Sequence, residues 1–146
     1  MSIGPEAFQQ IAKIEDLMIA LKKCQALITE AKKDNEARVQ ASLGALAELK
    51  LRITESEKTW GKLIKKSFWK DCEGEVPDME DRFDGTRFVV RFAEKAKKRR
   101  AAQNASKHAA VIDYLLEKGV KPADIPAAPR ALLRLMSFPP RRWSHI

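Results

Sequence analysis

Apolar residues recur every three or four positions from residue 14 onward, and this spacing limits what the chain can fold into. The recurring residues are Ile14, Leu17, Leu21, Cys24, Ile28 and Ala31. Alternation by three and four places such side chains along one stripe of an α-helix. A second stripe consists of Leu46, Leu49, Ile53, Ser56, Trp60 and Leu63. The chain is therefore predicted to be mainly α, with a long helical segment over residues 1–70.

The two stripes do not share one register, so the helical segment has two interpretations. Asn35, Arg38 and Ser42 stand where the first stripe would continue. Either Asp34 or Asn35 caps a new helix and the halves fold back as an antiparallel hairpin, or one long coiled-coil helix continues through a shifted register. Both interpretations predict a seam at which helices pair, within the chain or in a homo-oligomer. Its residues are Ile14, Leu17, Leu21, Ile28, Leu46, Leu49 and Ile53.

Charge is segregated in the middle of the chain. Residues 71–81 contain six acidic residues and no basic one, a net charge of −6. Residues 82–107 contain nine basic residues against two acidic ones, a net charge of +7, and the chain of 146 residues carries +8. A basic block attracts polyanions, so nucleic acid is the expected partner. The charge blocks indicate three parts: the helical segment 1–70, an acidic loop 71–81 interrupted by Gly74 and Pro77, and a basic segment 82–146.

Residues 82–92 at the start of the basic segment have two interpretations. Asp84-Gly85 suits a type I′ turn. Beyond it, Phe88, Val90 and Phe92 alternate with Arg87, Val89 and Arg91, which predicts a strand and hence a small β-hairpin. Alternatively, Thr86 caps a helix that runs on to Leu116. Further along, short C-terminal helices are predicted over residues 108–118, ended by Gly119, and over residues 130–136.

The basic segment also supplies the candidate nucleic-acid contacts. They are Arg87, Arg91, Lys95, Lys97, Lys98, Arg99, Arg100, Lys107, Arg141 and Arg142. Contacts of this type bind phosphate, so binding is expected to be independent of sequence and steeply dependent on salt. The alternative is a helical interaction or assembly protein that binds a helical protein partner through the N-terminal seam.

Nothing in the sequence indicates catalysis, a metal or a cofactor. The histidines, His108 and His145, stand in no cluster with metal-ligand spacing, and no Gly-rich phosphate loop occurs. Two cysteines, Cys24 and Cys72, are too few for a disulfide framework. No stretch approaches the roughly 20 apolar residues of a membrane span. We therefore expect a cytoplasmic, non-catalytic protein that is not in a membrane.

The order of the predicted elements resembles the Gam host-nuclease inhibitors of Mu-like phages. The resemblance lies in a long helical pair over residues 11–68 with Trp60 near its end, a Gly-containing turn into a basic-aromatic strand over residues 83–92, and a helix over residues 109–118 stopped by Gly119. It implies a phage protein that acts as a homodimer, coats or encircles the ends of double-stranded DNA without reading sequence, and blocks exonucleases.

Overall fold

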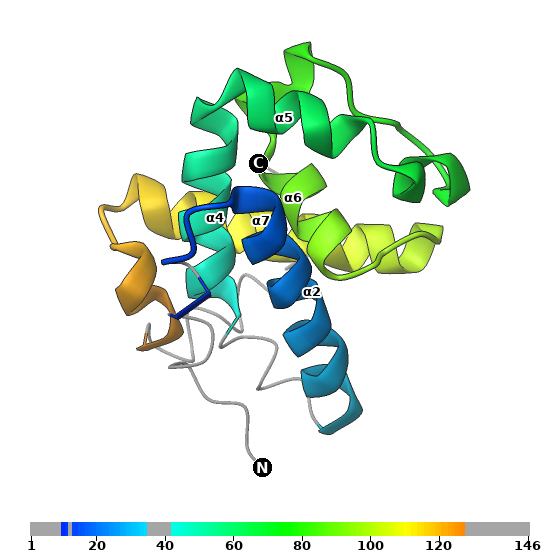
Figure 1. Ribbon diagram of the computed structural model, residues 1–146. Helices are drawn as coiled ribbons and strands as arrows, with labels where there is room; N and C mark the ends of the chain where they lie inside the picture. The colour runs from blue at the N-terminus through cyan, green and yellow to red at the C-terminus, as the bar shows by residue number, and fades with distance from the viewer. Residues whose placement is uncertain (1–9, 12, 35–41, 128–146) are drawn as a thin grey trace, which may run out of the picture.

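The computed structural model describes residues 10–11, 13–34 and 42–127 and is mainly helical, as predicted (Figure 1). The α-helices of these ranges are α2 (Leu17–Asp34), α4 (Leu43–Glu55), α5 (Glu57–Ile64), α6 (Thr86–Ala93) and α7 (Arg99–Glu117). Short 3-10 helices form at η1 (Ser67–Asp71), η2 (Glu80–Asp84) and η3 (Pro122–Ala127). Within the described ranges, no helix is long and apolar enough to cross a membrane.

Polar residues and a glycine set the ends of these helices. The Asp16 carboxylate accepts hydrogen bonds from the backbone N–H groups of Met18 and Ile19, both at 3.1 Å, and so caps α2. The Ser56 hydroxyl accepts from the N–H of Thr59 at 3.2 Å, so a new helix starts within the second apolar stripe. Gly119, with φ of +85°, follows the end of α7, as the sequence predicted.

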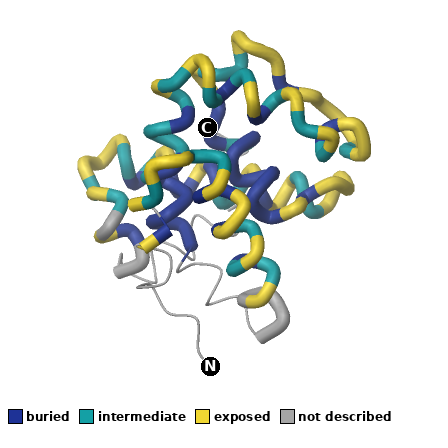
Figure 2. The backbone as a smooth tube through the Cα atoms, in the orientation of Figure 1, coloured by how far each residue is buried: buried dark blue, intermediate teal, exposed yellow. Residues whose placement is uncertain are grey.

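Helix α4 lies at the centre of the fold, where it packs against α2, α5, α6, α7 and η3. Figure 2 shows buried backbone concentrated along α4 and α6. Helices α2 and α4 run in opposite directions (Figure 1), but both belong to one core that extends from Ile11 to Ile125. The helical and basic segments therefore share this core, and α2 and α4 do not stand apart from it as a separate coiled coil.

The predicted partner seam is used for packing within the chain. Five of its residues are completely buried, namely Leu21, Ile28, Leu46, Leu49 and Ile53. Ile14 and Leu17 are partly buried and pack against the same core. Side chains that are already covered by their own chain offer no surface to another protein. The alternative in which the seam grips a partner helix is thus incompatible with the fold at these five positions.

The prediction of a β-hairpin over residues 82–92 is wrong. Residues 80–84 form η2 and residues 86–93 form α6. The alternative of one helix from Thr86 to Leu116 is also wrong, because α6 ends at Ala93 and α7 begins only at Arg99. Seven of the eight residues of α6 are buried. Phe88 and Phe92 are four residues apart, as are Arg87 and Arg91, so the same residues that alternate along a strand also form an apolar and a basic face of a helix. The packing of α6 against its neighbours, and not the alternation of apolar residues, therefore determines that this segment is a helix.

Gly85 does not form the predicted type I′ turn, and glycine is required at this position for a different reason. Its φ of −84° is open to any residue, so no left-handed conformation requires glycine. A Cβ at this position would instead lie 2.9 Å from Thr54 Cγ2 and 2.9 Å from Trp60 Cζ3. Glycine is needed here because the start of α6 approaches α4 and α5 too closely for a side chain.

Replacing Lys95 with Gly should stabilise the protein by about 1 kcal/mol. Lys95 follows α6 with φ of +53°, a conformation in which a Cβ is unfavourable, and the next N–H, of Ala96, donates to the Arg91 carbonyl at 3.0 Å. Urea unfolding measures the gain. Lys95→Ala removes the same charge but keeps the Cβ, so an equal gain in that variant would contradict a backbone origin of the effect.

Candidate nucleic-acid interface

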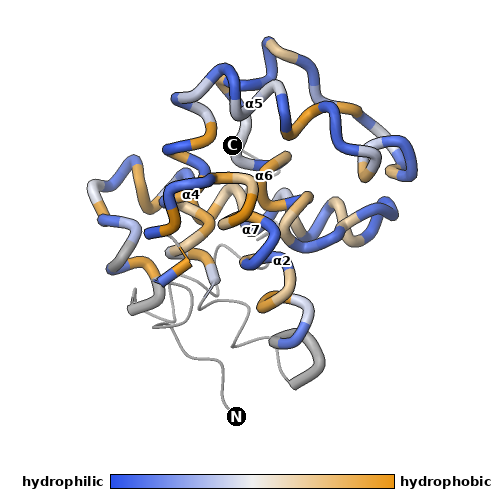
Figure 3. Tube along the Cα trace, viewed as in Figure 1, coloured by the Kyte–Doolittle hydropathy of each residue, from blue (hydrophilic) through white to orange (hydrophobic). Residues whose placement is uncertain are grey.

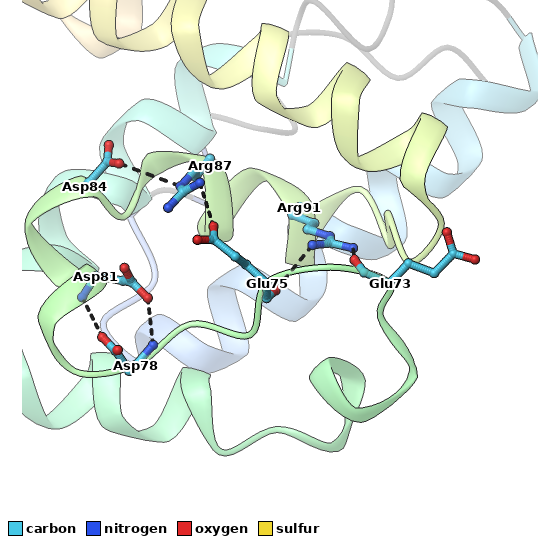
Figure 4. A network of polar contacts seen from close by, with 7 residues as sticks. All are labelled: Glu73, Glu75, Asp78, Asp81, Asp84, Arg87 and Arg91. Carbon is cyan, nitrogen blue, oxygen red and sulfur yellow. Dashed lines mark hydrogen bonds and ion pairs between the residues drawn. The ribbon is translucent and has the colours of Figure 1, made fainter.

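Arg91 is a structural residue and not the predicted nucleic-acid contact. It is 7% exposed, and its guanidinium donates to four backbone carbonyls. The acceptors are Ala96 O at 2.7 Å, Lys97 O at 3.1 Å, Glu75 O at 3.5 Å and Glu73 O. Figure 4 shows how Arg91 reaches the acidic segment from α6. Because each nitrogen of the guanidinium already has a backbone acceptor and the side chain is buried, Arg91 is not available to phosphate.

Two more predicted contacts are paired with acidic residues of the same chain. Arg87 Nη1 lies 2.8 Å from Glu75 Oε2, and its Nε lies 3.7 Å from Asp84 Oδ2 (Figure 4). Lys97 Nζ lies 3.7 Å from Asp71 Oδ2 and 5.8 Å from the centroid of the Phe68 ring. The acidic loop thus neutralises part of the basic block, and Arg87 and Lys97 are not free positive charges.

The remaining positive charge gathers where α7 begins. We call Lys95, Lys98, Arg99 and Arg100 the α7 basic cluster. All four are exposed, and none of them pairs with a carboxylate in the described part of the chain. Figure 3 shows a strongly hydrophilic stretch at this end of α7. Lys107 is half-buried about two turns further along the helix. Arg141 and Arg142, together with the helix predicted for residues 130–136, lie outside the described residues.

The first turn of α7 already binds one anionic oxygen. The backbone N–H of Arg99 donates to Glu73 Oε2 at 3.0 Å, and the backbone N–H of Glu73 donates to the Lys97 carbonyl at 2.8 Å. N–H groups at a helix start have no partner within the helix, and the helix dipole favours negative charge there. The carboxylate of Glu73 occupies the position at which a phosphate oxygen would accept from the same N–H group.

A second group of basic residues was not predicted from the sequence. Lys22 of α2 lies beside a groove that it shares with Lys62, Lys65 and Lys66 from α5 and the segment after it. The lysines at 62, 65 and 66 are spaced as neighbours on one helical face, so this part of the pattern was visible in the sequence. The approach of Lys22 depends on the packing of α2 against α5 and could not be seen there.

The buried carboxylate of Glu94, directly after α6, lies against His108 of α7 and acts on Cys24 of α2. His108 Nδ1 lies 2.6 Å from Glu94 Oε2, and Glu94 is only 6% exposed. Cys24 is completely buried, and burial together with the charge of Glu94 raises the pKa of its thiol to about 12. A thiol needs a depressed pKa to act as a nucleophile, so the environment of Cys24 is that of a structural cysteine.

The two cysteines should react very differently with a thiol reagent at pH 8. Cys72 is partly exposed, and burial raises its pKa although Arg91 and Lys97 act in the opposite direction. Cys24 is both inaccessible and held neutral. We expect one thiol per chain to react in the folded protein, more slowly than a small free thiol, and the second to react only in denaturant. Peptide mapping of the labelled protein identifies the site, and early labelling of Cys24 would contradict its burial.

Comparison of the chain with protein-family models, with curated proteins and with solved structures finds no match. Among the described residues, no three His, Cys, Asp or Glu side chains are grouped so that they could hold a metal ion. The functional assignment therefore rests on the geometry and charge of this chain's own residues.

Proposed function

We propose that this protein binds nucleic acid without reading its sequence, through contacts between phosphate groups and the α7 basic cluster. One observation carries the proposal: four exposed cations, Lys95 and Lys98 before α7 and Arg99 and Arg100 in its first turn, have no carboxylate partner in the described part of the chain. The neighbouring Arg87, Arg91 and Lys97 are engaged elsewhere. The cluster is thus the part of the basic block whose charge remains available to a polyanion.

The start of α7 adds a second favourable contribution. The backbone N–H of Arg99 binds the Glu73 carboxylate, a weaker and singly charged analogue of the phosphate group that would have to displace it. Lys98, Arg99 and Arg100 follow one another, so their side chains spread around the first turn instead of forming a stripe. Such an arrangement suits contacts with the phosphate backbone and does not present a row of side chains to base edges in a groove.

Replacing Lys98, Arg99 and Arg100 with Ala should weaken binding to all sequences alike. Each lost phosphate contact lowers the dependence of log K on log salt by about 0.9, so the slope should fall by about 2 to 3. Fluorescence anisotropy of labelled duplex and single-stranded DNA, titrated at several salt concentrations, measures both effects.

The matched control replaces Lys58, Lys118 and Lys121 with Ala, which removes the same charge from exposed positions elsewhere. An equal loss in the control would show that only net charge matters and would contradict a site at α7. Absence of binding by the unmodified protein at physiological salt would overturn the proposed function altogether.

A role in protecting double-stranded DNA ends, which the resemblance to the Gam inhibitors implies, is the narrower form of this proposal. The strand over residues 83–92 that supported the resemblance is helical instead, which weakens this narrower form. Competition by linear and circular duplexes of equal length tests it, together with protection of linear DNA from an exonuclease. Preference for the linear molecule would support end protection, and equal binding would restrict the function to coating.

A further inference from the structure

The exposed large apolar side chains of the described residues occupy two surfaces of opposite charge. Val76, Met79 and Phe83 are 56%, 41% and 86% exposed and lie within eight residues of one another. The fourth, Ile19, is 49% exposed and lies on α2. Exposed apolar side chains that gather with charged residues mark sites of protein contact more often than isolated ones do. The proposed nucleic-acid contacts account for neither of these two surfaces.

The first is an acidic surface formed by residues 76–84. Val76, Met79 and Phe83 alternate there with four carboxylates, those of Asp78, Glu80, Asp81 and Asp84. Arg82 is the one basic residue of this range, and it is directed inward to the Thr54 carbonyl at 3.2 Å while its guanidinium lies over the Phe83 ring. The surface therefore presents apolar groups among carboxylates, of which Asp84 also lies 3.7 Å from Arg87 Nε.

The acidic surface is held in a defined conformation. The indole N–H of Trp60 donates to the Asp78 carbonyl at 2.8 Å. Asp78 Oδ1 accepts from the N–H groups of Glu80 and Asp81, and Asp81 Oδ2 accepts from the N–H of Asp78 (Figure 4). A surface fixed in this way loses less conformational entropy when it binds a partner.

The second surface is the lysine groove between α2 and α5. It has a volume of about 460 Å³ and is lined by the apolar Met18 and Ile19 and by Lys22, Lys62, Lys65 and Lys66. Asp16 also lines it, but its carboxylate caps the first turn of α2. None of the four lysines pairs with a carboxylate among the residues that the structure describes. The groove thus offers apolar contact and unneutralised positive charge, which is the complement of the acidic surface.

We propose that the acidic surface of one copy of this chain binds the lysine groove of a second copy. The two surfaces are complementary in apolar contact and in charge: one presents three exposed apolar side chains among carboxylates, and the other presents Met18 and Ile19 among lysines. Helix α5 joins the two surfaces, since its Trp60 anchors the acidic surface and its Lys62 lines the groove. A two-fold dimer makes both contacts at once, because each copy then supplies one surface of each kind.

The test is the mass of the nucleic-acid-free protein in solution, measured by sedimentation over a range of concentrations. We expect the 16.5 kDa chain to form a dimer as its concentration rises. Lys62→Glu with Lys65→Glu should abolish the association, and so should Glu80→Lys with Asp84→Lys. An equimolar mixture of the two double variants should associate again, because the intact acidic surface of one variant then meets the intact groove of the other, and the two reversed surfaces, again of opposite charge, meet each other.

Two further variants distinguish this contact from a general effect of net charge. Phe83→Ser changes no charge and alters a side chain that is 86% exposed, so it should weaken association about tenfold or more without affecting the unfolding transition. Replacement of Lys98, Arg99 and Arg100 with Ala should leave the association unchanged, because the α7 basic cluster belongs to neither surface.

Three results of the mass measurement would overturn the inference. They are a monomer at every concentration, unchanged association in either charge-reversed variant, and failure of the mixture to associate. Loss of DNA binding by the groove variant with no change in mass would likewise overturn it, by assigning the lysines to nucleic acid. Since the measurement contains no DNA, its outcome is independent of whether the proposed nucleic-acid function holds.

Discussion

Replacing Arg91 with Ala is expected to lower the free energy of unfolding by about 3 to 5 kcal/mol. The guanidinium is buried and donates to backbone carbonyls of both the acidic loop and the turn before α7, among them those of Glu73 and Ala96. Its removal leaves several carbonyls without a partner and with little access to water. Urea unfolding monitored by circular dichroism measures the loss.

Two control variants separate geometry from charge at Arg91. Arg91→Lys keeps the charge but lacks the planar fork that reaches several acceptors, so it should recover only a minor part of the stability. Arg87→Ala removes an arginine of the same helix whose carboxylate partners, Glu75 and Asp84, are largely exposed, and it should cost less than about 1 kcal/mol. Similar losses in Arg87→Ala and Arg91→Ala would show that Arg91 is not the residue that holds the acidic loop in place.

Replacing Trp60 with Ala is expected to cost about 3 to 5 kcal/mol as well, for a different reason. The indole is completely buried, its ring meets that of Phe88 edge to face at a centroid distance of 6.3 Å, and it closely approaches Gly85. The substitution leaves a large cavity between α5 and α6. It also removes the hydrogen bond to Asp78, the anchor of the acidic surface. Urea unfolding measures the total effect.

Trp60→Phe divides this effect into its two parts. It retains most of the apolar volume but leaves the Asp78 carbonyl without the indole donor, so the stability loss should be much smaller than in the Ala variant. Limited proteolysis near residues 76–84 should nevertheless become faster in both variants, because both lose the anchor. Unchanged proteolysis in Trp60→Phe would mean that Asp78 and Asp81 maintain the segment by themselves.

The candidate site was predictable as a region but not residue by residue. The α7 basic cluster lies within the basic block that the sequence indicated, and its four members were among the predicted contacts. Arg91 and Arg87 belong to the same block but face the interior or acidic partners, because α6 is a helix enclosed by the core and not an exposed strand. Lys22 has no unusual local sequence, and only the packing of α2 beside α5 brings it to the lysine groove.

The sequence by itself determined the helical class, the segregation of charge and the positions of several helix ends. These properties depend on residues within a few positions of each other: apolar spacing near one helical turn, consecutive charges, and a glycine such as Gly119. The tertiary structure alone decided which charges remain free. Arg91 reaches carbonyls of Glu73 and Glu75, 18 and 16 residues earlier, and Lys22 lines the same groove as Lys62 of α5. A basic side chain has the same charge whether it binds its own backbone or faces solvent, so only the folded position distinguishes a structural arginine from one available to phosphate.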